Sequence, residues 1–419
     1  MKFTKSNIFF YSLIVIALLS PAPYCRIPLG NTFVYWFFSF CIVLLIPYIR
    51  RKYNPVIQKN DYFFVTCFLI WAFIGAIRGF FIADNYWEFK NLISGLLCCS
   101  LPAMTFIFCP RVLLKFYRLW IKICIPAFFL FYLWMVTPGE VNFYLGPVFV
   151  IGCFLPYMPP KWKFIIGFLL AFMLVADFGG RSQVLKAFLS ICISLLCIFR
   201  KFVSEKMLRL AHWLCYISAI VLLVLGISGT FNIFTDMSSN SGKYVEKKIV
   251  NGEQVEDDLA ADTRTFIYVE VLQSALKNDY VLCGRSLARG NDSYSFGSYN
   301  AENLKTGKYE RYQNELCHLN IFTWLGVIGM LLYSLIYIRS SYLAVYRSNS
   351  YFLKLIGVFI AFHWAYGWIE DTTNFDILNI SLWSAIGMGL SSQFRAMTDK
   401  DFKQWVLGIF YKKKKTFIV

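Results

Sequence analysis

Apolar segments of membrane length recur along this chain, and they restrict its fold more than any other feature. Crossing about 30 Å of hydrocarbon takes about 20 apolar residues in a helix. Each such segment must be helical, because lipid offers no hydrogen-bond partners to an open backbone. We therefore predict an all-α, polytopic transmembrane bundle of about 12 spans. These lie at about 7–20, 31–49, 62–81, 91–108, 117–136, 142–158, 162–177, 183–199, 210–229, 316–338, 353–369 and 377–394.

A long polar stretch at residues 230–315 interrupts the apolar pattern. It divides the chain into a first bundle at 1–229 with about nine spans, the loop itself, a second bundle at 316–394 with about three spans, and a basic tail at 395–419. Loops this long within a compact fold usually carry function. We expect the loop to contain short helices, one of them at 262–278, and an irregular segment at 284–300.

The positive charges predict the orientation of the bundle. The chain holds 41 Lys and Arg against 24 Asp and Glu, and lysines and arginines gather in cytoplasmic loops. Most of them fall in alternate loops and in the tail, which we place in the cytoplasm with both termini. The opposite short loops hold few, namely Arg26, Arg78, Lys90, Arg181 and Lys186. The long loop then faces away from the cytoplasm. The basic residues carry no signature of nucleic-acid binding.

The 13 cysteines have no spacing typical of a zinc site or a disulfide framework. Most fall in apolar spans, where cysteine acts as a small hydrophobic residue. A disulfide between Cys283 and Cys317 stays open. The N-terminus could be a signal peptide, but we favour an uncleaved first span.

Charged residues near the ends of the spans are candidate functional groups, because a charge in the membrane costs about 2.5–3.5 kcal/mol. Arg181 lies in a short Gly-containing turn, where it either pairs with Asp177 or binds an anion. Lys90 opens the fourth span, and Glu370 and Asp371 close the eleventh. For these residues an interfacial role is the alternative to a functional one.

Three arginines of the long loop and one histidine complete the candidate set. Arg264 opens the helix at 262–278, in which Phe266, Val269, Leu272 and Leu276 share one face, and Arg285 and Arg289 lie in the irregular segment. His318 is one of three histidines and immediately precedes a span. A neutral imidazole at the boundary between water and lipid can accept a proton near pH 7. His363 is interpreted as a core histidine.

The chain resembles the O-antigen polymerase and O-antigen ligase superfamily in three segments. The turn FGGRSQVLKAFLS contains Arg181, the loop helix RTFIYVEVLQSALKNDYVLCG begins at Arg264, and HLNIFTWLGVIGML begins at His318. The chain departs from the family pattern in three ways: Asn320 is one position further from His318, the Arg–Ser order at 181–182 is inverted, and the proline before Gly284 is missing.

This resemblance implies a glycan transferase that uses an undecaprenyl-diphosphate-linked oligosaccharide outside the cytoplasm. Arg181 and Arg264 would stabilise the diphosphate leaving group without a metal or cofactor, and His318 would be the general base. Lys90, Arg285, Arg289, Asn320 and Glu370 would bind the diphosphate or glycan. The enzyme would lie in a bacterial inner membrane, its active face periplasmic, with a chain-length regulator or a flippase as a further partner.

Four functions remain open at this point, one of which is a non-enzymatic membrane scaffold. A polymerase would transfer the glycan to another lipid-linked repeat unit, and a ligase would transfer it to lipid A core. A transporter or flippase of lipid-linked oligosaccharide is the alternative from another class, although such proteins commonly show internal repeats. We favour the polymerase.

Overall fold

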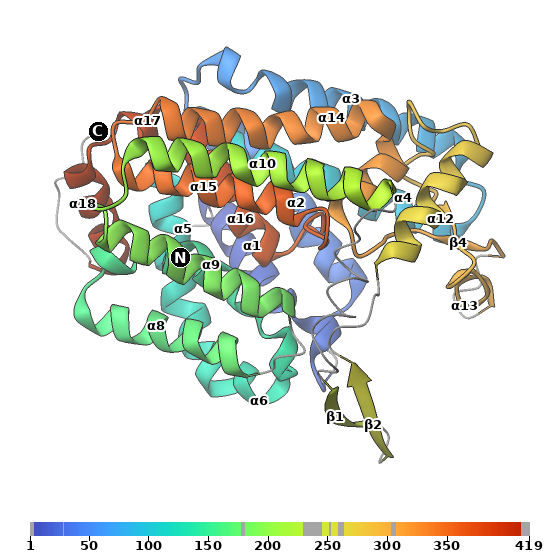
Figure 1. The fold of residues 1–419 in the computed structure, drawn as a ribbon, viewed down its shortest axis with the longest axis horizontal. Helices are drawn as coiled ribbons and strands as arrows, with labels where there is room; N and C mark the ends of the chain where they lie inside the picture. Colours follow the sequence, from blue (N-terminus) through green and yellow to red (C-terminus); the bar gives the residue numbers. More distant parts are fainter. Residues whose placement is uncertain are drawn as a thin grey trace.

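The computed structural model describes residues 4–27, 29–176, 181–228, 245–250, 253–258, 264–302 and 307–411. Helices make up nearly all of its regular structure (Figure 1). The first bundle contains α1 (Lys5–Leu19), α2 (Thr32–Tyr53), α3 (Phe63–Ile82), α4 (Tyr86–Ser100), α5 (Pro110–Ala127), α6 (Leu133–Met135), α7 (Asn142–Gly152), α8 (Pro160–Val175), α9 (Arg181–Ile198) and α10 (Glu205–Ile227). The later part contains α12 (Thr265–Lys277), α13 (Gly297–Glu302), α14 (Cys317–Tyr346), α15 (Tyr351–Tyr366), α16 (Ile377–Leu390), α17 (Ser392–Ala396) and α18 (Asp399–Phe410).

Short elements connect these helices. Two antiparallel strand pairs lie in the long loop, β1 (Val245–Val250) with β2 (Glu253–Asp258), and β3 (Asn291–Asp292) with β4 (Glu310–Arg311). Several helices continue into single turns of other helical types, as α4 does into a 3₁₀ turn at Leu101–Phe106 and α5 into a π turn at Phe128–Tyr132. The remaining 3₁₀ turns lie at Ala22–Tyr24, Lys59–Asp61, Pro138–Glu140 and Leu155–Tyr157.

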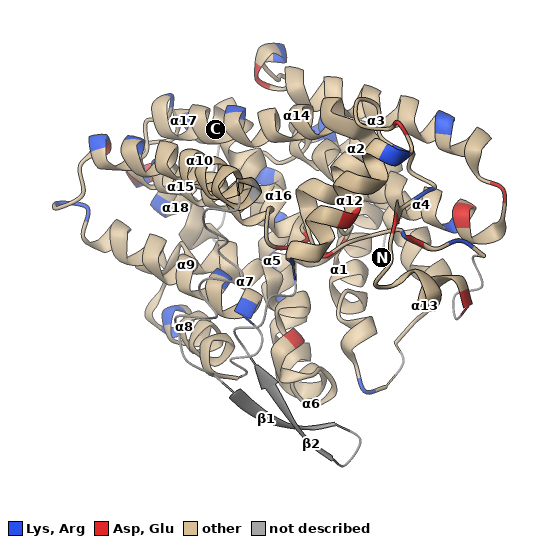
Figure 2. Cartoon of the chain, turned by 45° about the vertical axis from the view of Figure 1, so that its right-hand side comes forward, with Lys and Arg blue, Asp and Glu red and all other residues tan. Residues whose placement is uncertain are grey.

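Eight helices among the described residues are long and apolar enough to cross a membrane. They are α1, α2, α3, α4, α5, α9, α10 and α14, three of them with their short extensions. Large apolar side chains on their outward faces are exposed, including Phe33, Leu44, Phe73 and Phe81. Charged segments lie mostly at helix ends and in loops, while the helix middles are mainly uncharged (Figure 2). The all-α prediction and its membrane-type surface are therefore confirmed.

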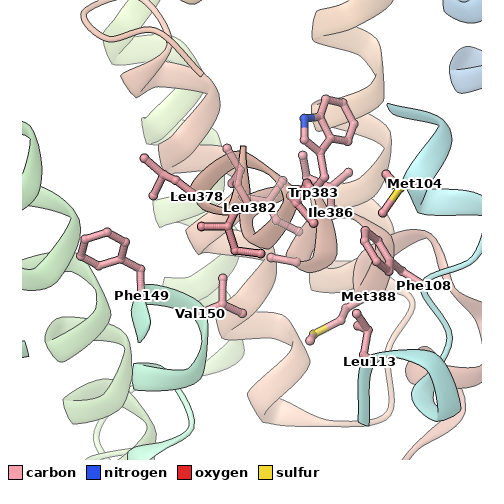
Figure 3. Close-up of a cluster of buried hydrophobic side chains, with 14 of the residues drawn as sticks. Met104, Phe108, Leu113, Phe149, Val150, Leu378, Leu382, Trp383, Ile386 and Met388 are labelled. Atoms are coloured by element: carbon pink, nitrogen blue, oxygen red, sulfur yellow. The ribbon is translucent and has the colours of Figure 1, made fainter. Parts of the chain in front are cut away.

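The other four predicted spans are shorter helices, so the count of about 12 stays a prediction. They correspond to α7, α8, α15 and α16, of 11, 16, 16 and 14 residues. All 14 residues of α16 are buried, and α16 forms the centre of the bundle. Leu378, Leu382 and Trp383 of this helix pack between Phe149 of α7 and Phe108, which precedes α5 (Figure 3).

Glycines allow the close packing around α16. A Cβ added at Gly146 of α7 would overlap the Leu378 backbone, and one added at Gly389 would overlap Ser340 of α14. Small residues at contacts of this kind are typical of helix packing in membranes. In this chain, therefore, an apolar run of 14–16 residues can reflect burial inside the protein as easily as a complete membrane span.

The long helices run side by side and define two ends of the bundle. In Figure 1, α3, α14, α10 and α15 lie roughly parallel, with α12 and α13 at one end and α18 at the other. We call these the loop end and the tail end. At the tail end, Asp61 accepts hydrogen bonds from Arg339 (3.0 Å) and Arg395 (2.5 Å), and Arg200 pairs with Asp399 (3.2 Å). Arg200, Arg339 and Arg395, which the positive-charge pattern predicts to lie on the cytoplasmic side, thus form ion pairs at the same end of the bundle.

Helix α12 follows the predicted loop helix but buries a different face. Ile267, Val271 and Ala275 are buried, whereas Val269, Leu272 and Leu276 are exposed. From the sequence, the latter face is expected to lie on the membrane or on other helices. The face packed against protein is the one with Ile267 and Val271, and it includes a buried Glu270 that a purely apolar pattern misses. A membrane contact of the exposed face stays a prediction. Glu270 accepts hydrogen bonds from Ser293 Oγ (2.7 Å) and from the Ser295 amide (2.8 Å). The predicted caps Asp262 and Thr263 lie outside the described residues.

Two further expectations concern local chemistry. Cys283 is an exposed free thiol and Cys317 a buried one, so the disulfide left open above is not formed. The segment 284–300 is mainly irregular, as expected, and includes β3 and the start of α13.

Candidate functional site

A turn between α15 and α16, residues 366–370, brings four distant segments together at the loop end. The amides of Cys317 and His318 at the start of α14 donate to the carbonyls of Glu370 (3.1 Å) and Gly367 (3.3 Å). From α12, the Tyr268 hydroxyl donates to the Trp368 carbonyl. The turn therefore fixes α12 relative to the start of α14.

The start of α9 contributes a cation to this turn. The Ser182 hydroxyl donates to Glu370 Oε1 (2.7 Å), and Lys186 Nζ donates to Ser182 Oγ (2.7 Å) and lies 3.8 Å from Glu370 Oε1. The Lys186 side chain is only 3 % exposed, and its ammonium lies 5.5 Å from the centre of the Tyr366 ring. A lysine this deep in an apolar helix is costly and calls for a partner or a function.

Arg264 of the long loop contacts the same turn, and Arg311 is joined to Arg264 through Glu315. Arg264, the N-cap residue of α12, donates from Nε to the Ile369 carbonyl (3.4 Å) and pairs with Glu315. Arg311 donates to the other oxygen of Glu315 (3.3 Å) and lies over the Phe296 ring at 4.4 Å. Its second terminal nitrogen, Nη1, is buried and has no hydrogen-bond partner among the described residues.

These residues form one cation-rich site, which we call the mouth cluster. Arg181 is the first residue of α9, directly before Ser182, and its side chain is exposed. Its expected partner Asp177 lies outside the described residues. Among the described residues, three cations share the two carboxylates Glu315 and Glu370, and Arg181 adds a fourth positive charge at the start of α9. The members of the mouth cluster are Arg181, Ser182, Lys186, Arg264, Arg311, Glu315 and Glu370.

His318 lies beside this cluster but is enclosed by protein rather than placed at a water–lipid boundary. Its ring is 1 % exposed and packs against Trp368, with ring centres 4.4 Å apart. Nε2 lies 2.9 Å from the Trp364 carbonyl, so this nitrogen carries the proton and donates it. Nδ1 is buried and has no partner among the described residues. The imidazole thus joins α14 to the 364–368 segment.

Arg285 and Arg289 belong to a separate group, which we call the rim cluster. Arg285 pairs with Asp292 (2.6 Å) and Glu310 (3.0 Å), and Arg289 donates hydrogen bonds to both carboxylate oxygens of Glu310. The hydrogen bonds that Arg289 donates to Glu310 raise the pKa of Arg289 despite its burial. The rim cluster balances four cations with four carboxylates, so it offers little attraction to an anion. Its members are Asp84, Glu88, Lys277, Arg285, Arg289, Asp292, Lys308 and Glu310.

The two remaining predicted site residues have local partners. Lys90 lies over the Trp87 ring at 5.0 Å, on the neighbouring turns of α4. Asn320 is fully buried and exchanges two hydrogen bonds with the Asn314 backbone (2.6 and 2.8 Å). Asn320 therefore fixes the loop before α14 and does not face a substrate space.

The structure thus brings Arg264 and Glu370 to one turn, with Arg181 at the nearby start of α9. His318 packs against the same turn. Arg285, Arg289 and Lys90 have other partners. The predicted set omitted Lys186, Arg311 and Glu315. Lys186 had a recognisable signal, since it lies one turn after Ser182 inside an apolar helix. Arg311 and Glu315 had none, because charged residues are ordinary in a polar loop.

Within the described ranges, no group of three or more His, Cys, Asp or Glu side chains could hold a metal ion. The mouth cluster offers instead guanidinium and ammonium donors, which suit phosphate oxygens. Comparisons with protein-family models, with curated proteins and with solved structures find no match to this chain.

Proposed function

We propose that this chain is a membrane glycosyltransferase that polymerises undecaprenyl-diphosphate-linked oligosaccharide repeat units of O-antigen, capsule or a similar surface polysaccharide. The bundle would lie in a bacterial inner membrane with both termini in the cytoplasm and the loop end in the periplasm. The resemblance of the segments around Arg181, Arg264 and His318 to O-antigen polymerases and ligases supports this proposal.

The cation excess of the mouth cluster is the observation that carries the proposal. A diphosphate that links a lipid to a sugar carries two negative charges. Among the described residues, Lys186, Arg264 and Arg311 exceed Glu315 and Glu370 by one positive charge, and the exposed Arg181 at the start of α9 adds a second. In the structure, Glu315 holds Arg264 and Arg311 in place, and Glu370 holds Lys186. A diphosphate would take over these contacts, with the guanidinium groups as its paired donors.

The same cations would accelerate the transfer. The bond between the anomeric carbon and the diphosphate oxygen breaks as the acceptor hydroxyl attacks, so negative charge grows on the leaving oxygen. Donors that are already in position stabilise such charge without reorganisation. Lys186 suits this role because it is held by Ser182 and Glu370 in a site that excludes most water.

The test is transfer by the purified full chain in liposomes, with lipid-linked repeat units isolated from the host as substrate. Lys186→Met is expected to lower kcat/KM by about 10²–10³-fold, as does loss of one preorganised donor in other enzymes. Lys277→Met is the matched control, since this exposed lysine lies at the same end in the rim cluster. Equal activity of Lys186→Met and wild type would refute the site. Movement of intact lipid-linked oligosaccharide without polymer would favour a transporter.

A further inference from the structure

A cavity lies at the loop end and is lined in part by Gln313 and by the 374–376 segment. It has a volume of about 470 Å³ and lies between the α1–α2 connection, α4 and the residues before α16. This volume is within the range of about 300–1,000 Å³ that is usual for small-molecule sites. The cavity is therefore large enough for an oligosaccharide segment.

Aromatic rings form part of the cavity wall. Tyr24, Tyr35, Trp36 and Phe143 line it, and the rings of Tyr24 and Phe143 stack with centres 4.3 Å apart. Tyr35 is fixed by its hydroxyl, which donates to the Phe375 carbonyl (2.5 Å). Rigid aromatic rings offer flat apolar surfaces with polar edges, which match the C–H faces and the hydroxyl edges of a sugar ring.

Polar side chains that can hydrogen-bond sugar hydroxyls line the same cavity. Asn31, Ser94, Gln313 and Asn374 all contribute. Gln313 donates to Asp371 (2.7 Å) and to Asn374 (2.9 Å), so the long loop forms part of the wall next to the mouth cluster. Ligand-binding sites usually combine many apolar residues with a few polar groups that orient the ligand.

Asp376 is the carboxylate of this cavity. It caps α16, since Oδ1 accepts the Asn379 amide (2.8 Å), and the residue is 5 % exposed. Burial raises its pKa to about 7 against the effect of that hydrogen bond, and the charge of Asp371 adds to the rise. The other ionisable groups facing it are Lys186, Tyr24, Tyr35 and Cys98.

We infer that this cavity binds the acceptor saccharide and that Asp376 accepts the proton of the attacking hydroxyl. The inference rests on the proposed function and adds to it an acceptor site and a base. The hydroxyl oxygen forms a bond to the anomeric carbon of the donor, and its proton passes to Asp376. The bond from that carbon to the carrier diphosphate breaks, and the diphosphate leaves with the electron pair toward the mouth cluster.

This assignment also suits the enclosure of His318. A general base must come within hydrogen-bond reach of the proton it takes, and Asp376 lines an open cavity whereas both nitrogens of His318 are buried. A base whose pKa lies near the working pH is effective in both taking and releasing a proton.

The binding test uses the purified full chain in phosphatidylcholine nanodiscs. The probe is the free oligosaccharide repeat unit released by mild acid from the host's surface polysaccharide, measured by calorimetry. Trp36→Ala is expected to raise Kd at least about tenfold. Trp134→Ala, an exposed tryptophan that does not line the cavity, is expected to leave Kd unchanged. No binding by wild type, or equal binding by both variants, overturns the site.

The base is tested by the pH profile of transfer. Wild-type kcat/KM is expected to rise with pH through about 7, because the carboxylate form of Asp376 is the active one. Asp376→Asn keeps the cap of α16, since Asn caps helices as well as Asp does. It is expected to lose at least about 100-fold in kcat/KM together with the pH dependence, while its thermal midpoint at pH 8 does not fall. A retained profile overturns the base.

The two proposals can fail separately. Lys186→Met is expected to keep saccharide binding while losing transfer. If wild type transfers glycan and the Trp36 and Asp376 variants do too, the acceptor site is wrong and the proposed function stands. If wild type binds saccharide through Trp36 but transfers no glycan, the proposed function is wrong and the cavity stands.

Discussion

Arg181 and Lys186 are close in sequence, yet their side chains differ in what a substitution can reveal. Arg181 is exposed at the first position of α9, whereas Lys186 is enclosed one turn later. Lysine cannot reproduce the two parallel hydrogen bonds that an arginine makes to a phosphate. Arg181→Lys is therefore expected to raise KM for the lipid-linked donor about tenfold while the protein folds normally.

The control for this prediction is Arg209→Lys at the other end of the molecule. Arg209 is also exposed and pairs with Glu205 in its own helix (3.6 Å), and its replacement is expected to leave KM and kcat unchanged. Wild-type KM in the Arg181→Lys variant would show that this residue does not hold the donor.

His318 acts in our interpretation as a positioning residue. Its Nε2–H and its backbone amide fix the 364–368 segment, to which α12 is joined through Tyr268. His318→Ala is expected to lower kcat/KM about tenfold or more and to leave the shape of the pH profile unchanged. The pH profile of the purified variant decides the matter, since loss of the wild-type dependence would restore the histidine as the base.

Single residues show how far sequence reasoning reaches. Glu370 could be proposed because charges beside apolar segments are unusual, and Arg264 could be proposed from the resemblance of the loop helix that it opens. Asp376 could not, because an aspartate before a helix is an ordinary cap, and its function depends on a cavity made by distant segments. Asn320 resembled a site residue but holds the Asn314 backbone.

At the scale of elements, a break in α14 joins the long loop to the bundle. Gly326 has φ of 70° and ψ of −171°, inside an otherwise helical segment. The chain at this point bonds to the loop before it, with the Val327 amide donating to the Val281 carbonyl (2.9 Å) and the Arg285 amide donating to the Thr323 carbonyl (2.7 Å). The break thus sets where the mouth and rim clusters lie along the bundle.

Gly326→Ala is expected to destabilise the protein. An added Cβ would overlap the Leu282 carbonyl oxygen, and a side chain in such a backbone region costs on the order of 1–3 kcal/mol. The thermal midpoint in detergent should fall by several degrees. Gly167→Ala in α8 is the control, because open space surrounds that position, and alanine there favours the helix by roughly 0.5–1 kcal/mol. An unchanged midpoint for Gly326→Ala would mean that the break is not required.

Elements could be predicted in number and type more easily than in length. The apolar runs located the helices of the predicted spans, because lipid and protein interior both demand apolar side chains. They did not locate α18, which lies within the predicted basic tail. Because both environments select apolar side chains, the runs at 142–158 and 377–394 did not indicate that α7 and α16 are short and buried. Their close packing requires Gly146 and Gly389, whose contacts with Leu378 and Ser340 appear only in the packed bundle.

At the scale of the whole molecule, sidedness connects the two sites to one reaction. The donor and acceptor sites both lie at the loop end, so a periplasmic reaction requires this end to face the periplasm. Cys283 is a natural reporter, since it is exposed at that end while the other cysteines are buried or half-buried. In intact cells a membrane-impermeant maleimide is expected to label Cys283 once the outer membrane is permeabilised.

A cysteine at the tail end is expected to be labelled from the opposite side of the membrane. Tyr411 follows α18 and is 53 % exposed, so Tyr411→Cys combined with Cys283→Ser should be labelled only after the inner membrane is opened. The loss of labelling in Cys283→Ser alone controls for the other thiols. Labelling of Tyr411→Cys in intact cells, with Cys283 protected, would place the mouth cluster and the saccharide cavity in the cytoplasm. A periplasmic polymerase could not then use them, because its lipid-linked substrates would present their diphosphates on the opposite side of the membrane.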